Sequence, residues 1–471
     1  MRLFEWMILL ALLPVLIWPL LPVRRPRVVD FLPLTAVSFF FFHCYIEGGR
    51  WQMIPAYVFA VAVFLVTLGR LWPSLSPSPE VEGLSGRKII TVVAGLLLWL
   101  TALALPVLLP VPKLPSLTGS YAVGTRTYHL VDRSRPEIYT AQQDDKREIM
   151  VQVWYPAVAD TQGKEAPYMD QLDVVGATLA ERLGLPSFLL NHINLVHTQT
   201  IVDAPLASHG APFPVLTFSH GLQGIRGQNT SLVRDLASHG FVVATIDHTY
   251  GNAITVFPDG RAVLYDPAVL SGEGEPPHTS NTLVGVWADD IGFVLDKLAV
   301  WNDEAGNAFN GRLDLSRVGV FGHSTGGGAT VQFCGRDPRC QAGVGLDAWV
   351  VPVSGVIVAG GLDQPFMFLR AAQWEFNDAA ANDAIAETLY NSLTRTGYLA
   401  TVSGAAHFDF SDLPLFSPLA QQLGLSGPMA GDYVVGLVND FVVRFFAQTL
   451  QGADEPLPVV YPEVTVVGNG R

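Results

Sequence analysis

The amino-acid sequence predicts an α/β fold, a mostly parallel sheet covered by helices, preceded by a bundle of about four membrane-spanning helices. Two observations support this prediction. After residue 113, short β-branched runs alternate with helical stretches, and strand–helix–strand repetition is typical of parallel sheets that are covered on both faces. Before residue 113, the chain is dominated by four long apolar stretches.

The four apolar stretches predict a transmembrane region over residues 1–113. Each has about 18–21 residues, enough to cross a hydrocarbon core of roughly 30 Å as a helix. A cleaved signal peptide explains the first stretch poorly, because no small-residue cleavage site precedes Arg24 and three further stretches follow. The stretches run approximately over Phe4–Leu21, Val28–Ile46, Met53–Leu71 and Ile89–Leu109.

Positive charges set the expected orientation of these helices, because Lys and Arg are enriched on the cytoplasmic side. The loop between the second and third stretches is short and balanced, with Glu47 and Arg50. We therefore expect both chain ends outside, with the C-terminal region facing the periplasm or the exterior. The positive charges that flank the other two loops are Arg24, Arg25, Arg27, Arg70, Arg87 and Lys88.

The region after residue 113 is acidic and has the character of a soluble domain. The chain has 28 Lys and Arg and 42 Asp and Glu, of which 19 and 37 lie after residue 113, a net charge of −18. Such a surface repels nucleic acid, so no nucleic-acid partner is expected. We predict one α/β domain over 114–452, entered through the linker Pro110–Ser120, and a loosely ordered tail over 453–471. The stretch Pro73–Ser85 is predicted to be a loop.

Strands and helices follow from the hydrophobic periodicity. In a mostly parallel sheet, the functional site is expected at the carboxyl ends of the strands. The predicted strands are Ile149–Tyr155, Val215–Ser219, Val242–Asp247, Arg317–Gly322, Ala342–Leu346, Phe366–Leu369 and Tyr398–Ser403. The predicted helices are Thr230–His239, Asn281–Asn302, Thr325–Cys334 and Tyr433–Thr449.

Ser324 lies in Gly322-His323-Ser324-Thr325-Gly326, the Gly-x-Ser-x-Gly pattern of a nucleophile elbow. In this motif the chain turns sharply from a strand into a helix, which leaves the serine hydroxyl clear of the sheet. The β-branched run before it and the helical stretch after it supply that context. We predict that Ser324 is a catalytic nucleophile in an α/β-hydrolase fold.

A serine hydroxyl needs a base to take its proton, and the base needs an orienting carboxylate. In α/β-hydrolases these follow the serine in the order acid, then histidine. His407 is the only histidine after Ser324 and follows a predicted strand, so we predict that it is the base. Asp347, directly after the strand Ala342–Leu346, is the preferred acid from position, and Glu375 is the alternative.

Backbone N–H groups must stabilise the oxyanion that forms when the serine attacks an ester. One is expected from Thr325, the residue after the nucleophile, and the other from a loop after an early strand. The segment Ser219–Arg226 begins at a strand end with Ser-His-Gly. We predict that the Leu222 amide is the second donor.

Two other carboxylates after Ser324 are rejected as the acid of the triad. Asp363 would lie at the wrong edge of the sheet, and Asp409 is too close to His407 in sequence to orient its ring.

The chain contains three cysteines. Cys334 and Cys340 bracket a predicted turn and are spaced either for a disulfide or as two unrelated thiols, and an oxidising exterior would permit the bond. The sequence contains no His-x-x-x-His and no paired Cys-x-x-Cys, so neither a metal nor a cofactor is predicted.

The segments Ser219–Arg226, Gly322–Gly327 and Leu346–Trp349, together with His407, resemble those of the platelet-activating factor acetylhydrolase family, the plasma and type II enzymes and their bacterial relatives. The resemblance covers roughly residues 120–450. It implies Asp347 as the acid and Ca²⁺-independent hydrolysis of short or oxidatively truncated acyl chains of glycerophospholipids. It also implies a bacterial-type member, and together with the four predicted spans this gives the expectation of a multi-pass protein of a bacterial inner membrane. Thr325 departs from the bulky aromatic residue of the animal enzymes.

The expected function is thus a membrane-anchored serine esterase whose partners are the bilayer and a lipid or small ester substrate. The alternatives are a general carboxylesterase, a polyester hydrolase or a peptidase on the same site, and a catalytically dead scaffold. The stretch between Pro167 and Ala207 fits no predicted strand and is interpreted either as a lid that could contact lipid, through Leu183–Leu190, or as an insertion with its own packing. Trp349 is expected either to line the acyl pocket or to lie in the core.

Overall fold

The computed structural model describes residues 1–21, 23, 25–71, 85–271, 279–454, 456–457 and 461–470. The chain forms two compact units, one of Met1–Pro112 with Phe416–Leu419 and one of Lys113–Leu415 with Ala420–Arg471. The predicted loop Pro73–Ser85 lies outside the described residues except for Ser85.

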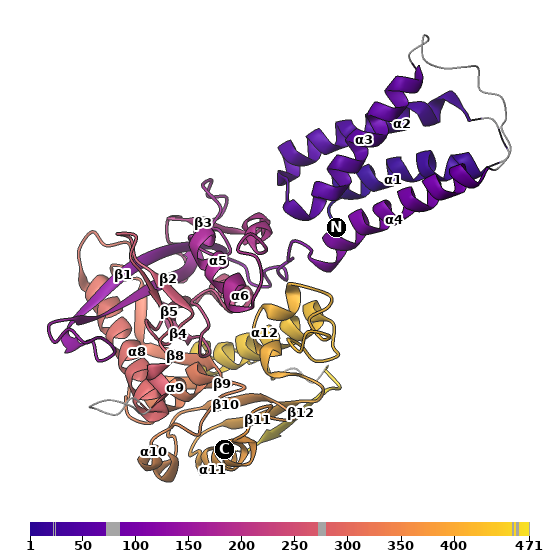
Figure 1. Ribbon diagram of the computed structural model, residues 1–471. Coiled ribbons are helices and arrows are strands. Elements are labelled where there is room, and N and C mark those ends of the chain that lie inside the picture. The colour runs from indigo at the N-terminus through magenta and orange to yellow at the C-terminus, as the bar shows by residue number, and fades with distance from the viewer. Residues whose placement is uncertain are drawn as a thin grey trace. The chain divides into compact units, whose positions relative to one another are not determined.

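The first unit contains four long apolar helices (Figure 1). α1 packs against α2 and α4, and α3 packs against α2 and α4. All four helices are long and apolar enough to span a membrane, so each predicted apolar stretch forms one such helix. Their bounds are Leu3–Ile17 for α1, Arg27–Phe42 for α2, Ile54–Leu71 for α3 and Gly86–Leu108 for α4.

Within the described residues, the second unit is built on one ten-stranded sheet with the strand order β12-β11-β10-β9-β8-β4-β5-β2-β1-β3 (Figure 1). The six central strands from β5 to β11 are parallel, and β2 and β12 pair antiparallel to them at either side. The parallel strands are β4 Phe213–Ser219, β5 Val242–Asp247, β8 Leu313–His323, β9 Cys340–Leu346, β10 Phe366–Ala371 and β11 Gly397–Val402. The remaining strands are β1 Ala122–Pro136, β2 Lys146–Ala157, β3 Thr200–Val202 and β12 Val464–Gly468, with the separate hairpin β6 Ile254–Val256 and β7 Ala262–Leu264.

Helices cover both faces of this sheet because successive strand residues point to opposite sides. On β4, Val215 belongs to a core shared with α8 and α9, whereas Leu216 belongs to a core shared with α6 and α12. This is the predicted α/β-hydrolase arrangement. The helices are α5 Leu172–Arg182, α6 Thr230–Ser238, α7 Ala268–Ser271, α8 Ser280–Asp303, α9 Thr325–Cys334, α10 Gly355–Gly360, α11 Ala379–Ser392 and α12 Gly431–Phe446.

The seven predicted strands and four predicted helices of this unit are present, but the structure adds strands that the periodicity did not reveal. β1 carries polar residues on much of its length, so it lacks a clear apolar run. β3 lies inside the Pro167–Ala207 stretch, to which the sequence analysis assigned no strand, and pairs with β1. The prediction of a loosely ordered tail was wrong for Val464–Gly468. This segment forms the edge strand β12, which pairs with β11.

Cys334, the last residue of α9, and Cys340, the first residue of β9, form a disulfide. The sequence left this pairing open, and the tertiary structure decides it. The bond closes a short loop directly behind the helix that follows Ser324.

Replacing Cys334 and Cys340 together with Ser is expected to lower the free energy of unfolding by about 2 kcal/mol, the chain-entropy value for so short a loop. Differential scanning fluorimetry of the detergent-solubilised protein should show a Tm lower by a few degrees. Cys44→Ser is the matched control, because Cys44 is a free cysteine in the first unit. An equal Tm for the double variant and the wild type would contradict a stabilising role.

Candidate active site

Ser324 lies between β8 and α9, at the carboxyl end of a central strand. Its backbone has φ 56° and ψ −118°, a conformation that L-residues other than glycine seldom adopt. The glycines on either side allow the turn to be this tight. A Cβ on Gly322 would overlap the Gly326 carbonyl, and a Cβ on Gly326 would overlap the Ser219 carbonyl on β4. The sequence pattern therefore has the steric cause that the nucleophile-elbow prediction assumed.

The turn is tied to the next strand by two backbone hydrogen bonds. The Ser324 N–H donates to the Leu346 carbonyl at 3.0 Å, and the Trp349 N–H donates to the Ser324 carbonyl at 2.8 Å. The strained serine is thus held by the segment that carries Asp347.

Asp347 and His407 lie in direct contact at the carboxyl ends of β9 and β11. The distance from Asp347 Oδ2 to His407 Nδ1 is 2.6 Å, and both side chains are 3% exposed. The other carboxylate oxygen, Oδ1, accepts the Ala371 N–H at 3.0 Å. One oxygen of Asp347 is therefore anchored to β10, which leaves the other to orient the His407 ring with Nε2 available to a serine proton.

The alternative acids do not share this position. Glu375 is exposed to solvent. Asp409 accepts hydrogen bonds from the Ala406 N–H, the Gly427 N–H and the Ser426 hydroxyl, which makes it a local structural carboxylate. The structure brings together Asp347 and His407, and it does not bring Glu375 to the histidine through any hydrogen bond among the described residues.

Aromatic rings surround His407. Trp374 and Phe376 approach its ring edge-on, with centroid distances of 5.0 Å and 4.8 Å. Asp378 accepts the indole N–H of Trp374 at 2.8 Å and that of Trp349 at 2.6 Å. Trp349 is half-buried and therefore does not lie in the core, and its role as a wall of the acyl pocket stays a prediction.

The two predicted oxyanion donors lie in the expected loops. Leu222 follows β4, and Thr325 is the first residue of α9. Within the described part of the chain, neither N–H donates a hydrogen bond to another protein group. The Thr325 N–H lies at the start of α9, where N–H groups have no partner within the helix. Both amides are therefore available to an oxyanion.

A series of hydrogen bonds that the sequence did not reveal links the predicted oxyanion loop to His407. Gln228 accepts the Gly221 N–H at 3.0 Å, and its amide nitrogen donates to His323 Nδ1 at 2.8 Å. His323 Nε2 then donates to the His407 carbonyl at 3.0 Å. Burial, and next to it the neighbouring His407, hold the pKa of His323 well below its usual value, so the ring stays neutral and can both donate and accept. Only the fold could reveal this link, because its members are far apart in sequence.

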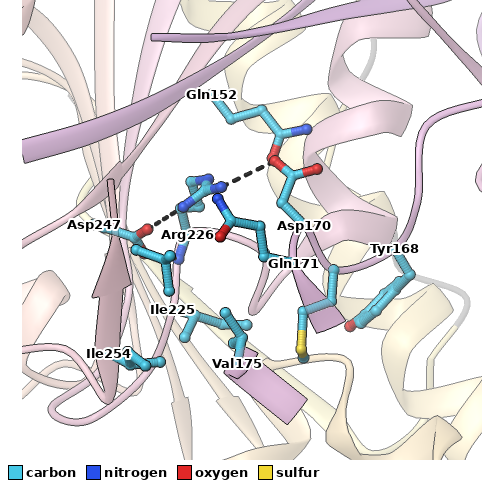
Figure 2. A pocket seen from close by; sticks show the side chains of 12 residues that line it. Gln152, Tyr168, Asp170, Gln171, Val175, Ile225, Arg226, Asp247 and Ile254 are labelled. Carbon is cyan, nitrogen blue, oxygen red and sulfur yellow. Dashed lines mark hydrogen bonds and ion pairs between the residues drawn. The ribbon is translucent and has the colours of Figure 1, made fainter. Parts of the chain in front are cut away.

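A small pocket lies beside the loop that carries Leu222 (Figure 2). Arg226 occupies its wall and pairs with Asp247 at the end of β5 and with Asp170, at 2.9 Å, from the Pro167–Ala207 stretch. Farther along the same stretch, Arg182 donates to the Gln223 side chain at 2.5 Å. This stretch is therefore attached to the predicted oxyanion loop at two points, and Leu183 and Phe188 leave 64% and 48% of their surface exposed.

Comparisons with known proteins show which family this chain resembles. The sequence pattern of the family described as platelet-activating factor acetylhydrolase, isoform II, matches residues 109–261 and 294–455. The chain is 28% identical over 297 residues to the platelet-activating factor acetylhydrolase of Cavia porcellus, covering 58% of this chain and 66% of that protein. It is 27% identical over 199 residues to the cutinase est2 of Thermobifida alba, covering 42% of this chain and 53% of that protein.

Among solved structures, a ferulic acid esterase from Streptomyces cinnamoneus superposes with a TM-score of 0.62 at 28% identity, covering 76% of this chain and 99% of that one. Its similarity confirms the predicted fold. The family match covers more than half of the chain and includes the segments that carry Ser324, Asp347 and His407. The chain therefore belongs to the platelet-activating factor acetylhydrolase isoform II family and is a carboxylic ester hydrolase.

Proposed function

We propose that the protein is a membrane-anchored serine esterase that removes short or truncated acyl chains from glycerophospholipids, with Ser324, Asp347 and His407 as its triad. The observation that carries the proposal is the buried 2.6 Å contact between Asp347 and His407 at the edge of the sheet where the strained Ser324 turn lies. A carboxylate, an imidazole and an elbow serine in this order are the groups that acyl transfer requires.

The reaction follows from these groups. His407 Nε2 takes the Ser324 hydroxyl proton as Oγ attacks the ester carbonyl carbon, and the resulting oxyanion accepts hydrogen bonds from the Leu222 and Thr325 amides. The ester C–O bond then breaks, and the alcohol, a lysophospholipid, leaves with the proton from His407. Water, deprotonated by His407, attacks the acyl-enzyme and releases the carboxylic acid and the free serine.

Membrane anchoring rests on the four helices of the first unit. Arg50 donates to Glu5 at 2.7 Å and to the Leu109 carbonyl at 2.6 Å, so the start of α1 and the end of α4 lie at the same end of this bundle. The sequence segments that join α1 to α2 and that precede α4 are richer in basic residues, with Arg25, Arg27, Arg87 and Lys88 among the described ones. The positive-inside tendency and the disulfide both favour an exterior location for the hydrolase unit.

Substrate choice is tested on detergent-purified full-length protein, with Ser324→Ala measured in parallel. Among p-nitrophenyl esters we expect kcat/KM for acetate and butyrate to exceed that for dodecanoate by about 10-fold or more, since each poorly accommodated methylene costs of the order of 1 kcal/mol. A phosphatidylcholine with an sn-2 acetyl group should likewise be cleaved faster than one with palmitoyl.

The relatives named cutinase and ferulic acid esterase favour a second candidate, a general carboxylesterase or polyester hydrolase. Faster turnover of a polyester film or of an aryl ester than of the acetylated phospholipid would replace the phospholipid assignment with this one. Absence of Ser324-dependent turnover on every ester would overturn both.

A further inference from the structure

A second Ser–His–Asp arrangement lies beneath the site. The Ser219 hydroxyl is 2.9 Å from His248 Nε2, and His248 Nδ1 is 2.9 Å from Asp290 Oδ2. All three residues are 0% exposed, so no substrate can reach this serine. We refer to Ser219, His248 and Asp290 as the buried relay.

The charges around the buried relay decide which atoms carry protons. Asp290 pairs with Arg147 at 2.7 Å and with Arg135 at 2.7 Å, and Arg147 is the larger of the two charge effects that hold the Asp290 pKa far below its usual value against burial. Burial lowers the pKa of His248. The ionised Asp290 therefore accepts from His248 Nδ1–H, and the Ser219 hydroxyl donates to His248 Nε2.

His220, the residue after Ser219, is held in place by His248 of the buried relay. The backbone N–H of His248 donates to His220 Nε2 at 3.3 Å, so the proton of the neutral ring is on Nδ1. Burial, and next to it the neighbouring His248, lower the pKa of His220 to about 3, so the ring stays neutral at any working pH. Trp287 packs against both imidazole rings, stacked on His248 and edge-on to His220.

The Nδ1–H of His220 acts on the peptide that carries the Leu222 amide. It donates to the Gly221 carbonyl at 2.7 Å, and the same carbonyl accepts the Gly224 N–H at 2.8 Å. Because a trans peptide is planar, its N–H and C=O point in opposite directions. A Gly221 carbonyl held toward His220 therefore turns the Leu222 N–H away from His220. Gly221 itself lies against Ser324, since a Cβ on this glycine would be 3.3 Å from the Ser324 Cβ.

We propose that His220, held by the buried relay, is a positioning residue that fixes the Gly221–Leu222 peptide with its N–H turned toward the oxyanion formed at Ser324. The inference rests on the proposed function, because the oxyanion exists only if Ser324 attacks an ester. A glycine-containing peptide rotates easily, and with the opposite face presented, its carbonyl oxygen would repel the oxyanion.

Two substitutions separate the two contacts of the ring. In His220→Asn the side-chain amide takes the place of Nδ1 and can still donate to Gly221, whereas in His220→Gln it takes the place of Nε2 and keeps the contact with His248. We expect kcat to fall about 10- to 100-fold in His220→Gln, with KM within about 3-fold of wild type, because the lost interaction is made only in the transition state. His220→Asn should keep kcat within about 5-fold of wild type. Both variants lose one hydrogen bond of a buried ring and should show similar falls in Tm.

Equal losses of kcat in the two variants at equal Tm would show that His220 acts through packing and would overturn the proposal, as would an unchanged kcat in His220→Gln. If His220→Gln does not fold, Ser219→Ala decides. It removes only the hydroxyl that holds His248, and kcat should fall about 3- to 10-fold at unchanged KM, whereas an unchanged kcat overturns the role of the relay. Fluorophosphonate labelling of wild-type Ser324 keeps the two proposals apart. Labelled wild type with unaffected variants rejects the positioning role alone, and unlabelled wild type rejects the proposed function and the inference with it.

Discussion

Replacing Ser324 with Ala is expected to lower kcat for p-nitrophenyl acetate by about 10⁴-fold or more, since removal of the nucleophile of a serine triad eliminates the acyl-enzyme route. Ser219, which also contacts a histidine, is fully buried, so no ester can reach it and it cannot replace Ser324 as the nucleophile. Fluorophosphonate labelling should be present in the wild type and absent in the variant.

The substitution removes one hydroxyl at a position whose strain comes from the backbone, so the fold should persist. An unchanged Tm beside the lost activity is the control for this. Activity near that of the wild type would mean that another residue is the nucleophile, and failure of both proteins to label would support the dead-scaffold alternative.

Asp347→Asn is expected to lower kcat by about 10⁴-fold, because the amide can donate to His407 Nδ1 and so favour the wrong tautomer of the ring. The 2.6 Å contact and the second bond to the Ala371 N–H hold this side chain in place, so the amide has no room to move away. Steady-state kinetics with a short-chain p-nitrophenyl ester measures the effect.

Glu375→Gln is the matched control, since Glu375 is the other acid that the sequence offered and it is exposed. Its kcat should remain within about 2-fold of wild type, as surface substitutions seldom have larger effects. A larger loss in Glu375→Gln than in Asp347→Asn would transfer the role of the acid to Glu375.

Local patterns in the sequence predicted the four apolar helices of the first unit and the central strands of the second. The four apolar helices are predictable because a membrane span depends only on length and hydrophobicity. The central strands are predictable because a strand buried on both faces is a continuous apolar run, as in β5 and β9. The polar β1 and the short edge strand β12 lack such a run, since their pairing depends on neighbours distant in the chain.

The candidate site divides in the same way. By itself, the sequence determined that Ser324 stands in an elbow, because the glycine spacing is a local steric requirement, and that His407 is the only histidine after it. Tertiary structure alone decided that Asp347, and not Glu375, contacts His407, that Cys334 and Cys340 are joined, and that His220 holds the Gly221 carbonyl. The physical reason is that hydrogen bonds and disulfides depend on distances of a few ångströms between groups that only the folded sheet brings together.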